Sequence, residues 1–307
     1  MTTAQPAATP RSAEMRGVIL TLAAVLVWSA NYIVGRALVG EVPPVMLAFW
    51  RWFFAFLAVL PLAARPLSRD WPIIRKHLGY YALTALLGVT VFNTLIYMAA
   101  HTSPALNIAF IVSCAPLLVL PAARILYNAP LPPRALLGLV LVLAGVVLLL
   151  CKGNLAVLAG MSFSAGDLLS VLSAICFAAY TLLVRKAPEG ASPWSFLAVT
   201  FGLGLLFLLP FVGLEQYLTP QAFLPSVKVW SCLVFVGVGP SLFSFACWNR
   251  AIADIGPVKA SILYYTMPLV SGVYAVIFLG EPVLWVHFAG GGLIVAGQLL
   301  GTVRGRK

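Results

Sequence analysis

The chain has 307 residues, of which 62% are hydrophobic and only 9% are charged, and its mean hydropathy is +1.02. Soluble domains carry roughly 25% charged residues, so this composition excludes a soluble globular protein and indicates a membrane protein. The positive charges behind the net charge of +11 lie mostly at the termini and in alternate connections instead of on one face, and this distribution argues against a nucleic-acid partner.

Ten apolar segments follow one another along the chain, each long enough to cross a hydrocarbon core as a helix of about 20 residues. The alternating pattern of membrane β-barrel strands is absent, so the predicted fold class is an all-α membrane protein. Residues 1–16, rich in Ala, Thr and Pro, are expected to form a disordered N-terminus, and 304–307 a basic C-terminus. The predicted spans are 17–37, 45–64, 79–100, 104–127, 133–151, 166–185, 194–214, 229–251, 257–279 and 283–302.

The positive charges indicate how the chain is oriented. Most of the 19 lysines and arginines lie at the two termini and in every second connection, whereas the opposite connections hold only Arg36, Lys152 and Lys228. Connections enriched in Lys and Arg stay in the cytoplasm, so both termini are predicted to be cytoplasmic.

The first five spans resemble the last five, with an offset that drifts from 149 to 152 residues. Because five is an odd number, the second copy has to enter the membrane from the other side, and two inverted five-helix repeats are predicted at 17–152 and 164–303. Such repeats are typical of transporters that enclose a central substrate site. The anchors of the first copy are Gly17, Trp28, Gly88, Phe92, Pro116 and Gly145, matched by Gly166, Phe177, Gly239, Phe243, Pro268 and Gly297.

Few side chains in the spans can titrate or ligate. His77, His101 and His287 lie near span ends without a second ligand at metal-binding spacing, and no hydrolase or metalloprotease motif is present. All eight acidic residues lie in connections or close to span ends, which disfavours a mid-membrane carboxylate relay. The five cysteines have no paired spacing and are interpreted as structural thiols. We therefore expect no enzymatic activity, no metal and no other cofactor.

Arg51 is the cation that lies well inside a predicted span, between Trp50 and Trp52. A buried arginine is costly unless it is paired, hydrated or able to reach the headgroups. It either binds a substrate carboxylate or holds backbone carbonyls or an interface lipid, as long side chains at this depth do. The corresponding residue of the other repeat is Thr200, so the charge is not part of the shared architecture. The second interpretation is favoured, because a long side chain at this depth can extend to the membrane interface.

Polar and aromatic residues inside the spans indicate a substrate site. Asn93 and Tyr97 are four residues apart and share a helix face, as do Ser244 and Trp248 at the corresponding place of the second repeat. Hydrogen bonds between helices, worth about 0.6 kcal/mol on average, explain scattered hydroxyls. A wet cavity with aromatic walls and few amides is the preferred interpretation for Asn31, Asn93, Tyr97, Trp248 and Tyr265.

Prolines and glycines inside the spans predict where helices kink and where they pack closely. Pro116 and Pro268 lie well inside the fourth and ninth spans, where each is predicted to kink the helix and provide a hinge. Glycines of the fifth and tenth spans predict close packing against a neighbouring span or another subunit, and the oligomeric state stays open. These glycines are Gly138, Gly145, Gly290, Gly291, Gly292, Gly297 and Gly301.

At residues 17–303 the sequence resembles the drug/metabolite transporter superfamily, specifically its ten-helix EamA-type members, and is similar to their aromatic amino-acid exporter branch. The first repeat departs from the second by having Asn128-Ala129-Pro130 in place of Gly280-Glu281-Pro282, so any role of Glu281 belongs to one half only. The resemblance is carried by Trp28-Ser29-Ala30-Asn31, Arg51, Pro116 with Gly138 and Gly145, and Pro268 with Gly280-Glu281-Pro282 and Gly290.

The resemblance implies a central cavity among spans 1, 3, 4, 6, 8 and 9, alternating access, and efflux across a bacterial inner membrane. The substrate-binding residues that it implies are Asn31, Tyr32, Asn93, Tyr97, Tyr180, Ser244, Trp248 and Tyr265.

We therefore expect an exporter of aromatic and other neutral amino acids whose two halves rock about the proline kinks. One alternative is an exporter of another solute class, such as drugs or nucleobases; a carrier of cations would need a carboxylate at the site. A membrane enzyme or a receptor-like binding protein is the second alternative, but the sequence offers it no catalytic constellation. Proton antiport and facilitated diffusion both stay open.

Overall fold

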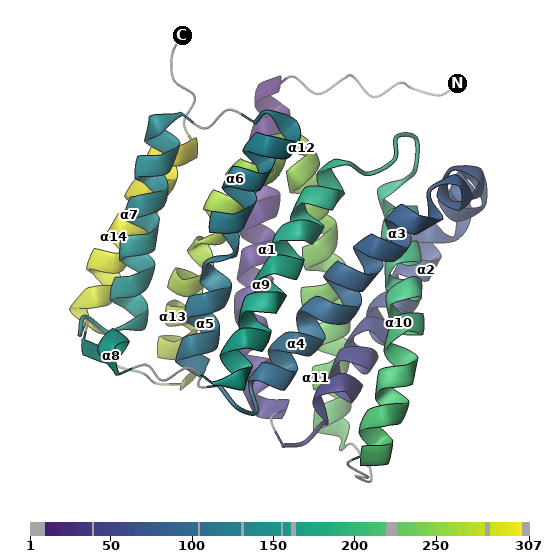
Figure 1. Ribbon diagram of the computed structural model, residues 1–307, viewed down its shortest axis with the longest axis horizontal. Coiled ribbons are helices and arrows are strands. Elements are labelled where there is room, and N and C mark those ends of the chain that lie inside the picture. The colour runs from purple at the N-terminus through teal and green to yellow at the C-terminus, as the bar shows by residue number, and fades with distance from the viewer. Residues whose placement is uncertain are drawn as a thin grey trace.

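The computed structural model describes residues 10–38, 40–103, 105–129, 132–154, 156–160, 164–218, 226–279 and 283–302. All regular structure in these ranges is helical (Figure 1), which agrees with the predicted all-α class. Eight helical segments of the described chain are long and apolar enough to cross a membrane, and the two segments Thr266–Phe278 and Trp285–Gly301 are apolar but shorter. One long segment, Val227–Tyr264, contains the predicted eighth span and the beginning of the ninth.

The helices divide several of the predicted spans. A non-helical Gly256, with φ 78° and ψ 163°, interrupts α12 and marks the turn between the predicted eighth and ninth spans. In chain order the elements are α1 (Pro10–Leu38), α2 (Pro44–Lys76), α3 (Leu78–Ala85), the π-helical η1 (Leu86–Val91), α4 (Phe92–Ala99), α5 (Ala105–Ser113), α6 (Ala115–Tyr127), α7 (Pro133–Leu150), α8 (Ala156–Ala159), α9 (Ala165–Arg185), α10 (Pro193–Leu218), α11 (Val227–Val236), the π-helical η2 (Gly237–Phe243), α12 (Ser244–Tyr264), α13 (Thr266–Leu279) and α14 (Trp285–Thr302).

The N-terminal boundary is a correction. Disorder was expected for residues 1–16, but α1 begins at Pro10 and includes residues 10–16. Proline is compatible with the first helical turn, and ion pairs to α12 stabilise this extension, because Arg16 binds Asp254 and Glu14 binds Lys259. Residues 1–9, 304–307 and the segment Gly280-Glu281-Pro282 lie outside the described residues.

Both proline positions coincide with helix breaks. α5 ends at Ser113 and α6 begins at Ala115, so Pro116 lies in the first turn of α6. In the same way α12 ends at Tyr264 and α13 begins at Thr266, so Pro268 lies in the first turn of α13. A proline in the first turn removes no hydrogen bond from its own helix, which explains why each helix restarts here.

Two π-helical segments occupy matching places in the chain and were not predicted. η1 begins at Leu86 and η2 begins at Gly237, 151 residues later. A π-turn changes the face that the following helix presents and leaves carbonyls available; in η2 the carbonyl of Pro240 accepts a hydrogen bond of 2.8 Å from the indole of Trp28.

The helices form two packed groups, and each group combines helices from the first half of the sequence with helices from the second half. α1 packs on α12 and α13, and we call these three helices the α1 unit; α9 packs on α4, α5 and α6, which form the α9 unit with it. The pair α7 and α14 flanks the units on one side and the pair α2 and α10 on the other (Figure 1). The start of α1 and the end of α14 lie at the upper end in Figure 1, called here the terminal end.

The antiparallel helices α2 and α10 cap each other. Asp70, near the end of α2, accepts hydrogen bonds from the backbone N–H of Ser192 at 2.6 Å and from the hydroxyl of Ser195 at 2.8 Å, at the start of α10. Glu215, near the end of α10, accepts hydrogen bonds from the backbone N–H groups of Val45 and Met46 at 2.9 Å. Each carboxylate therefore satisfies the free N–H groups of its partner helix and complements the partner's dipole.

Glycines hold α7 and α14 close together, as the sequence predicted for neighbouring spans. A Cβ atom added to Gly138 would lie 2.5 Å from the carbonyl oxygen of Gly297, and one added to Gly145 would lie 2.6 Å from that of Gly290. Both obstacles are backbone atoms, so larger residues would push the helices apart.

Candidate substrate cavity

A small cavity lies between the two units and brings three of the predicted site residues together. Asn31 is in the second half of α1, whereas Asn93 and Tyr97 are on α4, directly after the π-helical segment η1. The volume of the cavity is about 70 Å³, and these positions place it nearer the end of the bundle opposite the terminal end. The lining residues are Trp28, Asn31, Arg51, Phe92, Asn93, Ile96, Tyr97, Phe177, Tyr264 and Met267.

Arg51 lines this cavity, which corrects the preferred interpretation of a residue that reaches the membrane interface. Only 3% of its surface is exposed. Nε donates a hydrogen bond of 2.6 Å to the hydroxyl of Ser241, Nη1 donates one of 2.9 Å to the hydroxyl of Tyr97, and the guanidinium lies 5.3 Å from the ring centre of Trp52. Within the described part of the chain Arg51 forms no ion pair, so its charge has no carboxylate counterpart there.

The two asparagines carry unused hydrogen-bonding groups. Oδ1 of Asn31 and Nδ2 of Asn93 are buried and have no partner. Leaving a buried amide group unpaired costs about 1–3 kcal/mol, so these groups are available to a ligand that enters the cavity. The site therefore combines a cation, an acceptor and a donor within aromatic walls.

Tyr265 lies at a second, larger cavity of about 260 Å³, between α5, α7, α13 and α14. Tyr265 is 1% exposed, and its hydroxyl has no hydrogen-bond partner. Tyr264 and Met267 line both cavities, so the two spaces share a wall. The residues that line the second cavity are Ala109, Val112, Ser113, Leu149, Leu150, Lys152, Tyr264, Tyr265, Met267, Pro268, Ser271, Gly272 and His287.

The structure does not bring Tyr180, Ser244 and Trp248 to either cavity. All three are buried at the contact between the units or beside it. The hydroxyl of Tyr180 donates a hydrogen bond of 2.8 Å to Asn249, and that of Ser244 donates one of 3.3 Å to the carbonyl of Ala24. The side chain of Tyr32 lies outside the described residues.

Aromatic rings close the space between the cavity and the terminal end. Phe177 of α9 stacks on Trp248 of α12 with ring centres 5.6 Å apart, and Trp28 lies 5.5 Å from Trp248 and 6.1 Å from Phe177. Together with the hydrogen bond between Tyr180 and Asn249, these contacts join the α1 unit to the α9 unit on the terminal side.

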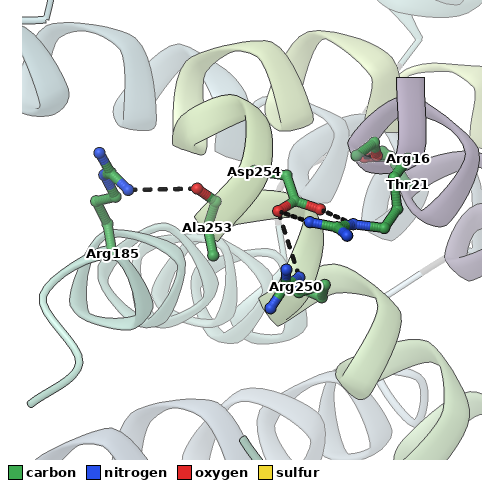
Figure 2. A network of polar contacts seen from close by, with 7 residues as sticks. Arg16, Thr21, Arg185, Arg250, Ala253 and Asp254 are labelled. Atoms are coloured by element: carbon green, nitrogen blue, oxygen red, sulfur yellow. Dashed lines mark hydrogen bonds and ion pairs between the residues drawn. The ribbon is translucent and has the colours of Figure 1, made fainter. Parts of the chain in front are cut away.

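A charged network joins the first turns of α1, at the terminal end, to α12. Figure 2 shows its contacts from close by. Asp254 accepts two hydrogen bonds of 2.8 Å from Arg16 of α1 and an ion pair of 3.3 Å from Arg250 on its own helix. The side chain of Asp254 is only 6% exposed, whereas those of Arg16 and Arg250 are 41% and 46% exposed, so solvent screens both pairs from the arginine side. Arg185 of α9 donates a hydrogen bond of 3.5 Å to the carbonyl of Ala253 in α12. Figure 2 shows this hydrogen bond, which joins the two units.

Sequence reasoning missed Trp28 and Phe177 as cavity residues, although both were repeat anchors. It placed Ser241 among the inward-facing polar residues of the eighth span but did not predict its pairing with Arg51. The hydroxyl of Ser241 accepts a hydrogen bond from Arg51 and donates one of 2.9 Å to the carbonyl of Val236. The signal that could have identified Trp28 and Phe177 as cavity residues is that they are aromatic and occupy matching positions of the two repeats.

Comparisons with known proteins agree with the fold. The chain is 26% identical to an uncharacterized transporter of Archaeoglobus fulgidus over 294 residues. This alignment covers 93% of this chain and 97% of the relative. A solved crystal structure superposes with a TM-score of 0.73 over 93% of this chain and 97% of that chain, at 20% identity, and supports the fold alone.

Two relatives have names that specify a substrate. A probable terminal-alkyne amino-acid exporter of Streptantibioticus cattleyicolor is 24% identical and covers 80% of this chain and 77% of its own length. A riboflavin transporter of Brucella anthropi is 24% identical and covers 66% of this chain and 69% of its own. The sequence profile of the EamA-like transporter family matches residues 15–151 and 164–302. With its apolar helices, this match shows that the chain is a multi-pass membrane transporter and belongs to the EamA-like transporter family.

Proposed function

We propose that this transporter exports zwitterionic amino acids with bulky, preferably aromatic, side chains. The observation that carries the proposal is the guanidinium of Arg51, buried at the cavity without a carboxylate counterpart in the described chain. A substrate carboxylate would neutralise this charge, and hydrogen bonds to charged groups are the stronger ones, at about 1.5–3 kcal/mol each.

The remaining polar groups suit the other end of the same molecule. Oδ1 of Asn31 is an unpaired acceptor and fits an ammonium group, whereas Nδ2 of Asn93 is an unpaired donor and fits a second carboxylate oxygen. The rings of Trp28, Phe92 and Phe177 form apolar walls around them. A site with apolar walls and a few convergent polar groups is typical of small-molecule recognition.

Alternating access of two inverted halves is the mechanism that we propose with it. In this conformation the α1 and α9 units touch on the terminal side, through Tyr180 with Asn249 and through Phe177 with Trp248, and the cavities lie nearer the opposite end. Separation of these contacts, with bending at the breaks beside Pro116 and Pro268, would open the terminal side and close the other. Under the predicted orientation in a bacterial inner membrane, with both termini cytoplasmic, the present conformation faces outward.

Flux measurements on purified protein in liposomes test this function. Phenylalanine, tyrosine, tryptophan, methionine and threonine would be compared with riboflavin, with and without a pH gradient. We expect the aromatic amino acids to move faster than through empty liposomes. If none of the five amino acids does so, the proposal is wrong, and riboflavin flux alone would favour the substrate named for the Brucella anthropi relative.

Analogues test the zwitterion chemistry. Phenylalanine amide lacks the carboxylate that Arg51 would bind, and hydrocinnamic acid lacks the ammonium that Asn31 would bind. Both should compete with phenylalanine more weakly than tyrosine does. Equal competition by all three compounds would contradict the assignment of these two residues.

A further inference from the structure

The larger cavity is distinct from the polar one but adjoins it. Its volume of about 260 Å³ is close to the lower end of the roughly 300–1,000 Å³ typical of small-molecule sites, whereas the cavity at Arg51 has about 70 Å³. The smaller space suffices for charged main-chain groups but not for a ring. Tyr264 and Met267 separate the two, so a molecule that passes this wall would occupy both.

Apolar side chains form most of the larger cavity, and several polar side chains, among them Lys152, interrupt them. The hydroxyl groups of Tyr265 and Ser271 are buried without a partner. Nδ1 of His287 accepts a hydrogen bond of 2.9 Å from the backbone N–H of Leu284, so in the neutral ring the proton is on Nε2 and can be donated. The cavity thus provides donors and acceptors that the protein itself leaves unused.

Resting on the proposed function, we propose that this cavity is the side-chain subsite of the transporter and selects rings that carry a hydrogen-bonding substituent. The α-carboxylate and α-ammonium would lie at Arg51 and Asn31, and the ring would pass the wall of Tyr264 and Met267. A phenol or an indole would satisfy the hydroxyls of Tyr265 and Ser271, whereas a phenyl ring would leave them unpaired.

A purely apolar occupant explains the cavity less well. A phenyl ring or a lipid acyl chain would match the apolar walls but would keep two buried hydroxyls without partners. Sites built to hydrogen-bond a substrate group reject the analogue that lacks the group, because their own polar atoms stay unpaired. The expected preference is therefore for tyrosine and tryptophan over phenylalanine.

Selectivity in liposomes tests this subsite. The initial fluxes of tyrosine, tryptophan and phenylalanine would be measured from an equimolar mixture for the wild type, Tyr265→Phe and Ser271→Ala. Each substitution removes one hydroxyl, and we expect the ratio of tyrosine flux to phenylalanine flux to fall about fivefold. Tyr127→Phe is the matched control, because its hydroxyl binds the carbonyl of Leu182, away from both cavities.

A second variant tests the volume of the subsite. A Cβ atom added to Gly272 meets only the edge of His287, at 3.6 Å, so Gly272→Leu would fill the cavity without obstructing the backbone. We expect it to lower the fluxes of the three aromatic amino acids at least tenfold more than the flux of threonine. Thermal stabilisation of the purified variants by tyrosine and by phenylalanine provides the same comparison without transport.

The outcomes separate the two proposals. If wild-type protein transports amino acids but Tyr265→Phe and Ser271→Ala change tyrosine and phenylalanine equally, the subsite is wrong and the proposed function stands. If the wild type neither transports nor is stabilised by any amino acid, the proposed function is wrong and the subsite falls with it. A changed ratio in Tyr127→Phe would also overturn the subsite, because that hydroxyl is remote from it.

Discussion

Replacing Arg51 by methionine tests the central claim about the site. Methionine keeps an unbranched apolar stem but removes the charge. The surroundings tolerate this change, because the hydroxyl of Ser241 still donates to the carbonyl of Val236 and the partly exposed Tyr97 can bind water. The variant is therefore expected to fold, and its defect should lie in substrate binding.

The size of the defect follows from the contact that is lost. A hydrogen bond to a charged group contributes about 1.5–3 kcal/mol, which corresponds to an increase of about 10- to 150-fold in the KM for phenylalanine. Arg51→Lys retains the charge but cannot hold Ser241 and Tyr97 at once as the planar guanidinium does, and should fall between the wild type and Arg51→Met.

Concentration-dependent flux in liposomes measures this effect, with Arg65→Met as the control. Arg65 is an exposed residue of the same helix, so its loss changes the net charge equally without touching the cavity. Phenylalanine amide, which lacks the carboxylate, should compete equally well in the wild type and in Arg51→Met. An equal KM for phenylalanine in folded Arg51→Met and Arg65→Met would refute the reasoning.

Three further predictions concern stability and conformation. Asp70→Ala leaves the backbone N–H and hydroxyl groups at the start of α10 without their acceptor and should lower the free energy of unfolding by about 1–3 kcal/mol, read as a lower Tm in detergent; an unchanged Tm would contradict the capping role. Gly138→Ala places a Cβ atom 2.5 Å from a carbonyl oxygen of α14 and should destabilise the protein, whereas Gly213→Ala, which meets nothing within 4 Å, should not; equal effects would refute the tight helix contact. Tyr180→Phe removes the hydrogen bond to Asn249 between the two units and should raise the population open at the terminal side about fivefold, measured by spin-label distances across that end; an unchanged distance distribution would argue against a closing role.

Part of this architecture could be predicted from sequence because its causes are local. Glycines spaced along the fifth and tenth spans present small faces whatever surrounds them, and Gly138 and Gly145 do pack on the backbone of α14. Pro116 and Pro268 cannot continue a helix from the preceding turn, and the helices do restart beside them. The positions of these glycines and prolines in the sequence were enough to predict the close helix packing and the helix breaks.

The rest depends on partners far away in the chain. Arg51 is stabilised inside the protein by Ser241, 190 residues later, and no local pattern reveals this pairing. The π-helical segments have no clear local signature, so the orientation of Asn93 and Tyr97 behind η1 could not be worked out in detail. Tyr180 and Trp248 were expected to face the cavity, but in this conformation the two units close on them, and a sequence does not state which conformation is populated.

The exchange of helices between the units has a consequence for biosynthesis. α1 is synthesised first, yet the carboxylate that binds Arg16 belongs to Asp254, 238 residues downstream. During translation the first helix must therefore stay in the bilayer without its final neighbours until almost the whole polypeptide has left the ribosome. Correct packing of α1 therefore depends on the last third of the chain. A chain truncated before α12 would leave α1 without its packing partners and exposed to degradation.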